Sequence, residues 1–145
     1  MNKGKIAREY FEQGYNCAQA VFTAFKEETG LDEKTALRLS SAFGGGIAGM
    51  RETCGAVSGM LMAFGALKGY DAVIDADEKK AFYENARALA EEFKALHSTL
   101  NCAELLKSHE IVPTAEPSNR DEEYYRKRPC ARYVEACANL LNAKL

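Results

Sequence analysis

Residues 16–21 read NCAQAV and residues 101–106 read NCAELL, so one short pattern occurs twice in the chain. In both copies Asn comes directly before Cys, and Gln or Glu follows as the third residue after Asn. Asn is a strong N-cap residue, and a Gln or Glu at that position can bond back to the backbone of the cap. The pattern therefore predicts two different helices, each with cysteine as its first residue.

The rest of the sequence is also typical of helices. Apolar residues recur at helical spacing, and no segment alternates between apolar and polar residues as a strand would. We expect helices over residues 3–13, 16–30, 32–43, 53–69, 77–97, 101–109 and 129–145, with a surface loop at residues 110–123 that holds two of the three prolines. The prediction is an all-α, single-domain helical bundle covering residues 1–145.

The expected helix over residues 53–69 is rich in glycine. Thr53 is its expected cap, and the glycine pairs Gly55/Gly59 and Gly65/Gly69 are each four residues apart. Glycine inside a helix costs about 1 kcal/mol relative to alanine. We therefore expect that a close neighbour packs along this helix. The neighbour is a ligand, another helix of the bundle or a second copy of the chain in a homodimer.

Composition excludes several classes of protein. The apolar fraction is 47%, the charged fraction is 28% and the net charge is −2, with both signs mixed along the chain. A nucleic-acid-binding protein would show a basic face, so we expect no nucleic-acid partner. The longest weakly polar stretch, residues 54–67, is shorter than the ~20 residues of a membrane span, and the N-terminus lacks an export signal. The sequence predicts a cytoplasmic protein without direct membrane insertion.

The cysteines are the main functional signal. Four of the five fall in the first turn of four different expected helices: Cys17, Cys54, Cys102 and Cys130. Unpaired amides and the positive end of a helix stabilise an anion by ~0.3–1 kcal/mol, so this position favours the thiolate, which binds metals and attacks disulfides. Asn16, Thr53 and Asn101 are the expected supporting caps. Cys137 lies on an apolar helical stripe, where core packing is the simpler interpretation.

Other motifs carry less weight. The segment GGGIAG at residues 44–49 matches G-x-G-x-x-G in form, but a helix and not a strand precedes it. We interpret it as a turn that lets the chain approach the cysteines. His97 and His109 are interpreted as surface or capping residues. No conventional catalytic constellation is present, so catalytic residues are not assigned, and any enzymatic activity would resemble that of an oxidoreductase.

These residues together resemble a known family. Cys17 in GYNCAQAV, the stretch CGAVSG at residues 54–59, Cys102 and Cys130 are similar to the motifs of the C-GCAxxG-C-C family of redox-active proteins. The resemblance covers nearly the whole chain. It implies that Cys17, Cys54, Cys102 and Cys130 are the functional set, with Gly55 and Gly59 as the motif glycines, and it has no place for Cys137.

Three hypotheses follow for this four-cysteine redox or metal site. In the first, the cysteines bind an iron–sulfur cluster, most simply [2Fe–2S], and the protein transfers electrons to a redox partner protein. In the second, the same cysteines form reversible disulfides and no cofactor is needed. In the third, they hold a structural zinc ion. The spacing of the cysteines matches no C-x-x-C signature and does not choose among these hypotheses.

Overall fold

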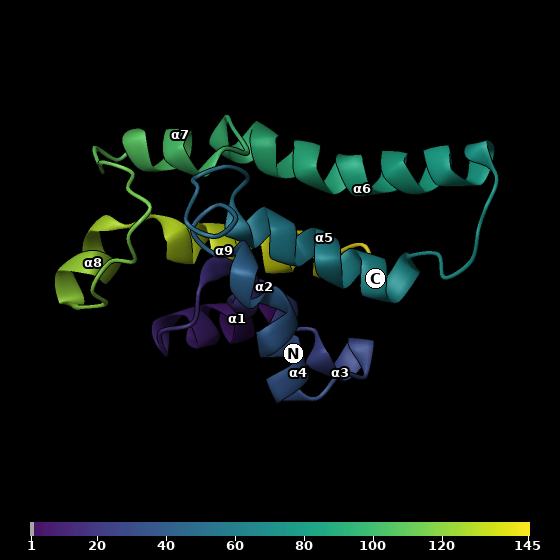
Figure 1. Ribbon diagram of the computed structural model, residues 1–145, viewed down its shortest axis with the longest axis horizontal. Helices are drawn as coiled ribbons and strands as arrows, with labels where there is room; N and C mark the ends of the chain where they lie inside the picture. Colours follow the sequence, from purple (N-terminus) through teal and green to yellow (C-terminus); the bar gives the residue numbers. More distant parts are fainter. Residues whose placement is uncertain (1) are drawn as a thin grey trace.

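The computed structural model describes residues 2–145, and within this range it contains helices and no strand (Figure 1). The elements in chain order are α1 (Lys3–Glu12), α2 (Cys17–Thr23), α3 (Lys26–Thr29), α4 (Glu33–Ser40), the 3₁₀ turn η1 (Ser41–Phe43), α5 (Gly55–Lys68), α6 (Ala76–His97), α7 (Cys102–Lys107), α8 (Glu122–Lys127) and α9 (Cys130–Asn142). The predicted all-α bundle is confirmed. Over the described residues, no helix is both long enough and apolar enough to cross a membrane.

The core lies between α1, α2, α5 and α9. Helix α1 packs mainly on α9, and α2 packs mainly on α5. The long helix α6 lies across the top of Figure 1 and covers α5 and α9. The largest fully buried side chains come from all of these helices and include Phe11, Val21, Met60, Phe93, Val134 and Leu141.

The repeated Asn-Cys pattern starts two helices, as predicted. The Asn16 side chain accepts from the Gln19 amide at 2.9 Å, and the Gln19 side chain accepts from the Asn16 amide at 3.1 Å. This closed capping box fixes the start of α2. At the second copy, Asn101 accepts from the Glu104 amide at 3.0 Å, but the Glu104 carboxylate bonds to Thr99 instead of returning to the cap.

Several expected boundaries are wrong. The expected helix over 16–30 is broken between Thr23 and Lys26 into α2 and α3. Helix α6 begins at Ala76 because Asp75, and not Asp77, caps it by accepting from the Glu78 amide at 2.8 Å.

The expected loop at residues 110–123 is also too long. Helix α8 begins inside it, at Glu122, where the Asp121 side chain accepts from the Tyr124 amide at 2.8 Å.

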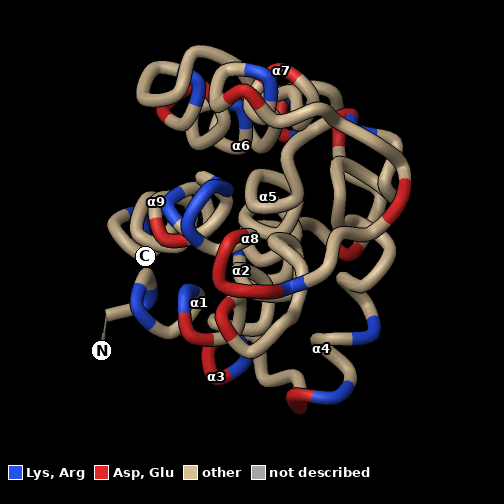
Figure 2. The backbone as a smooth tube through the Cα atoms, turned by 90° about the vertical axis from the view of Figure 1, so that its left-hand side faces the viewer, with Lys and Arg blue, Asp and Glu red and all other residues tan. Residues whose placement is uncertain are grey.

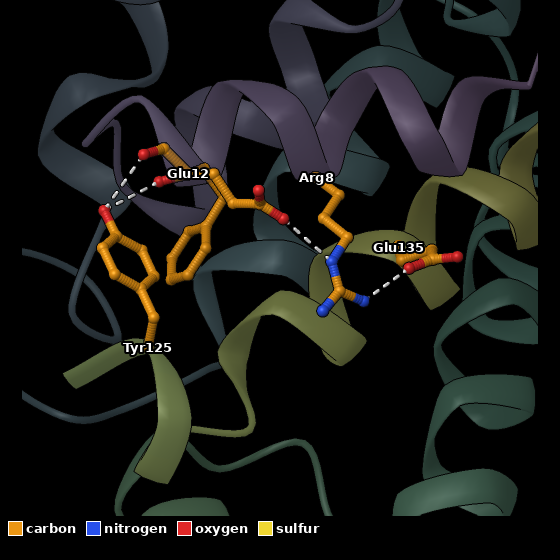
Figure 3. Close-up of polar contacts among 5 residues, drawn as sticks. Arg8, Glu12, Tyr125 and Glu135 are labelled. Atoms are coloured by element: carbon orange, nitrogen blue, oxygen red, sulfur yellow. Dashed lines mark hydrogen bonds and ion pairs between the residues drawn. The ribbon is translucent and has the colours of Figure 1, made fainter. Parts of the chain in front are cut away.

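Polar contacts join α1 to α8 and α9 (Figure 3). The Arg8 guanidinium donates to Glu12 on α1 at 3.0 Å and to Glu135 on α9 at 2.9 Å. The Tyr125 hydroxyl, which reaches across from α8, donates to the carbonyl oxygens of Phe11 and Glu12, at 3.4 Å each. These contacts hold α8 and the N-terminal half of α9 against the end of α1.

The glycines of α5 divide into two kinds. A Cβ atom added at Gly59 would lie 2.6 Å from the Ala18 carbonyl oxygen, and one added at Gly55 would lie 3.2 Å from the Ala18 amide nitrogen. Gly65 faces open space, with no atom within 4 Å of such a Cβ. The expected close neighbour is therefore α2, at the two motif glycines, while the Gly65 end of α5 has none.

We predict that Gly59→Ala destabilises the fold by about 1–3 kcal/mol, because the added methyl group overlaps the α2 backbone, which cannot move without disturbing the core. Gly65→Ala is the matched control and should be neutral or stabilising by up to about 1 kcal/mol, since alanine favours the helix and the space is free. Urea unfolding of both variants measures the difference. Equal stability of the two variants would contradict the close α2–α5 contact.

Candidate functional site

The four predicted cysteines line one cavity. The cavity has a volume of about 320 Å³, and Cys17, Cys54, Cys102 and Cys130 all contribute to its wall. Cys17, Cys102 and Cys130 are the first residues of α2, α7 and α9, and Cys54 is the N-cap residue of α5. Four helix starts from distant parts of the chain therefore meet at this cavity.

Thr53 has a different role from the predicted cap. It forms an isolated antiparallel bridge with Asn101, and α5 starts without a side-chain cap bond. On either side of the bridge, the Cys54 amide donates to the Leu100 carbonyl at 2.7 Å and the Cys102 amide donates to the Glu52 carbonyl at 2.6 Å. This short extended pairing holds Cys54 beside Cys102.

The GGGIAG loop forms another part of the cavity wall. Residues 45–49 all have positive φ, and this run includes the non-glycine residues Ile47 and Ala48. A Cβ atom at Gly46 would lie 2.7 Å from Cβ of Cys102, and one at Gly44 would collide with the Asn16 side chain. The loop is thus a turn packed against the cysteine site, as interpreted from the sequence.

Cys130 and Cys17 form an interacting pair. The interaction between the two neighbouring thiols lowers the pKa of Cys130 and raises that of Cys17. The guanidinium groups of Arg128, Arg120 and Arg51 lower the pKa of Cys130 further, to about 7, against the opposing effect of burial. Cys17 and Cys130 are both half-buried as whole residues. Cys130 is therefore the cysteine of this pair that is ionised near neutral pH.

The expectation that all four cysteines favour the thiolate is wrong for Cys17, Cys54 and Cys102, whose pKa values are raised. Burial raises the pKa of Cys54 to about 12, and the neighbouring Cys130 adds to the increase. Burial also raises the pKa of Cys102, although the Arg51 guanidinium donates to its Sγ at 3.6 Å. The reason is that withdrawal from water and repulsion between neighbouring thiolates exceed the modest stabilisation by a helix start.

Three arginines surround the cysteines: Arg51, Arg120 and Arg128. In the sequence, Arg51 lies three residues before Cys54 and Arg128 lies two residues before Cys130. Arg120 and Tyr124 also line the cavity, and they were not identified from the sequence. Arg120 stacks on Phe11 and Tyr124, with its guanidinium carbon 4.6 and 4.7 Å from the two ring centroids. No local sequence pattern marks this contact, since it joins α1 to a segment more than a hundred residues later.

Residues 113–120, here called the strap, cross one side of the cavity. Ala115, Pro117 and Ser118 line it. The strap is held by arginine side chains: Arg51 Nε donates to the Thr114 carbonyl at 2.7 Å, and Arg128 donates to Ser118 Oγ at 2.7 Å. Side chains and not a backbone ladder therefore hold the strap in place.

The cysteines are spread over the cavity wall and are not gathered around one point. Over residues 2–145, no group of three or more His, Cys, Asp or Glu side chains is placed to hold a metal ion. A structural zinc ion needs about four ligands around a single centre, and this arrangement does not fit it. Cys137 is fully buried in the core and does not line the cavity. This placement agrees with its interpretation as a packing residue.

Comparison with known proteins gives one result. Residues 15–144 match the model of the C_GCAxxG_C_C family, described as "Putative redox-active protein (C_GCAxxG_C_C)". No curated protein and no solved structure matches the chain.

We predict that iodoacetamide modifies Cys130 first in the reduced, metal-free protein. Its thiolate fraction grows as the pH rises through about 7, whereas Cys54 remains protonated until about pH 12. Peptide mapping by mass spectrometry over a series from about pH 5 to 10 should give a midpoint near pH 7 for Cys130 and none within this range for Cys54. In Cys17→Ala the Cys130 midpoint should move upward, because alanine removes the neighbouring thiol that lowers the pKa of Cys130. Equal rates at Cys130 and Cys102 would contradict this assignment.

Proposed function

The chain belongs to the C_GCAxxG_C_C family, and we propose that it is a thiol–disulfide redox protein in which Cys130 and Cys17 exchange two electrons with a disulfide substrate. The observation that carries this proposal is that Cys130 and Cys17 line the same cavity, where their interaction lowers the pKa of Cys130 and raises that of Cys17. An ionised nucleophile beside a protonated partner is the arrangement that disulfide exchange requires.

The proposed exchange takes place in two steps. The Cys130 thiolate attacks one sulfur of the substrate disulfide, the substrate S–S bond breaks, and the leaving thiolate takes up a proton. Cys17 then loses its proton and attacks Sγ of Cys130, which forms the Cys17–Cys130 disulfide and releases the second substrate thiol. If the proton that Cys130 released to solvent on ionising is counted, the two cysteines lose two electrons and two protons, and the substrate disulfide gains two of each.

The protein provides three aids to this exchange. The neighbouring Cys17 thiol and the three arginines stabilise the Cys130 thiolate. The capping box at Asn16 fixes Cys17 at the start of α2. The raised pKa values of Cys54 and Cys102 keep these thiols protonated, so that they do not compete with Cys130 as nucleophiles near neutral pH.

We expect a limiting amount of 2-hydroxyethyl disulfide to oxidise the reduced protein by the loss of two hydrogen atoms. Proteolysis without reductant should then yield one cross-linked peptide pair, joining Cys17 to Cys130. Cys130→Ser should abolish the cross-link, and Cys137→Ser, which changes a core cysteine outside the cavity, should retain it. A cross-link between Cys54 and Cys102, or none at all, would count against the proposed pair.

A second candidate function rests on the number of cysteines. Four of them, and not two, line the cavity, and four thiolates suit an iron–sulfur cluster in both number and kind. Their spread also suits a group larger than one ion. Cys17, Cys54, Cys102 and Cys130 would hold such a cluster, which would supply one-electron transfer when bound. Arg51, Arg120 and Arg128 would offset the negative charge of the four thiolates.

This candidate predicts iron and acid-labile sulfide in protein produced with cluster-assembly proteins and purified without oxygen. Cys54→Ser should remove both, since it takes away one ligand, and Cys137→Ser should leave them unchanged. Iron and sulfide assays with visible absorption spectra provide the measurement. A colourless, iron-free preparation would eliminate the cluster and leave thiol–disulfide exchange as the function.

A further inference from the structure

The cavity carries positive charge that no carboxylate neutralises. Arg51, Arg120 and Arg128 are the charged side chains among its lining residues, and no Asp or Glu of residues 2–145 lines it. None of the three arginines forms an ion pair with a carboxylate in the described part of the chain. Elsewhere on this end of the molecule acidic and basic residues are mixed, as Figure 2 shows around α8.

The three guanidinium groups are fixed in place by contacts with neutral groups. Arg51 bonds to the Thr114 carbonyl and Cys102 Sγ, and Arg128 bonds to Ser118 Oγ. Arg120 donates through Nη2 to the Tyr15 carbonyl at 3.2 Å. Its other terminal nitrogen, Nη1, is buried and has no hydrogen-bond partner in the described residues. Because these guanidinium groups are already held in place and keep N–H donors without a partner, they can bind an anion with little further loss of side-chain entropy.

The same cavity holds the reacting sulfur. Cys130 and all three arginines line a space of about 320 Å³, which is at the lower end of the range for small-molecule sites. A ligand of a few carbon atoms can therefore place a negative group on an arginine and a sulfur atom at Cys130. A cationic ligand of the same size would bring like charges together in a partly desolvated site.

On the basis of the proposed thiol–disulfide exchange, we infer that the substrate is a small organic disulfide with anionic ends, and that Arg51, Arg120 and Arg128 form its anion-binding site. The guanidinium donors bind the carboxylate or phosphate group, and the substrate disulfide lies against Cys130. The strap encloses the ligand, because Arg51 and Arg128 hold it across the cavity.

Three disulfides of similar size and different charge test this inference. They are 3,3′-dithiodipropionate, which is anionic, 2-hydroxyethyl disulfide, which is neutral, and cystamine, which is cationic. Each second-order rate for the reduced protein is divided by the rate of the same disulfide with free 2-mercaptoethanol. The normalised rate should be highest for the anion and lowest for the cation, and the preference should shrink as salt is raised to about 1 M.

Two neighbouring residues supply matched variants. Arg128→Gln removes a cavity charge that also lowers the pKa of Cys130, so both disulfides should react more slowly with this variant. The ratio of the dithiodipropionate rate to the hydroxyethyl disulfide rate, in which the change at Cys130 cancels, should fall about ten-fold. Lys127→Gln removes an equal charge from a residue that is ion-paired with Glu123 and does not line the cavity, so its rates should match those of the parent. Thermal unfolding establishes that both variants are folded, and Arg51→Gln provides a second cavity variant.

Binding without reaction separates this inference from the proposed function. Titration calorimetry should detect the binding of dithiodipropionate to the Cys130→Ser protein and should detect no binding of hydroxyethyl disulfide. If all three disulfides react at equal normalised rates, or if the Lys127 and Arg128 variants behave alike, the anion site is overturned and thiol–disulfide exchange stands. If dithiodipropionate binds the Cys130→Ser protein but no disulfide oxidises the parent, the anion site stands and thiol–disulfide exchange fails.

Discussion

The close approach of α5 to α2 is the constraint on which the site depends. It is possible because Gly55 and Gly59 have no side chains where the α2 backbone passes, near Ala18. Cys54 comes directly before the first of these glycines, and Cys17 comes directly before Ala18. The CGAVSG stretch therefore has one packing role and one chemical role, since the glycines that let the helices meet also place two cysteines at the same cavity.

The electrostatics of the cavity follow from a balance between burial and charge. Taking a thiol out of water raises its pKa, and this effect prevails at Cys54 and Cys102. It is overcome only at Cys130, which has a thiol donor and three guanidinium groups around it. The position at a helix start, which Cys130 shares with Cys17 and Cys102, is not sufficient by itself. The arrangement differentiates chemically equivalent residues into one cysteine with a lowered pKa and three with raised pKa values.

Sequence reasoning succeeded where the determinants are local. A cap and the turn that follows it lie within four residues, so the starts of α2 and α7 could be predicted from Asn16 and Asn101. It failed where distant segments decide. The pairing of residues 52–54 with residues 100–102, which displaces Thr53 from its expected capping role, depends on contacts across almost fifty residues. Arg120 was missed for the same reason, because its stacking partner Phe11 belongs to the first helix.

The left-handed run at residues 45–49 has a consequence for local stability. Ile47 and Ala48 adopt a backbone conformation that costs L-residues about 1–2 kcal/mol each, so this loop keeps its shape only while its surroundings impose it. Part of that support comes from the strap, whose Ala115 carbonyl packs against Gly49. Detaching residues 113–120 would release the loop as well, so both segments belong to one cooperative opening unit. Hydrogen exchange at the backbone amides of the two segments would accordingly give the same opening free energy, and this value would be lower than that of the helices beneath them.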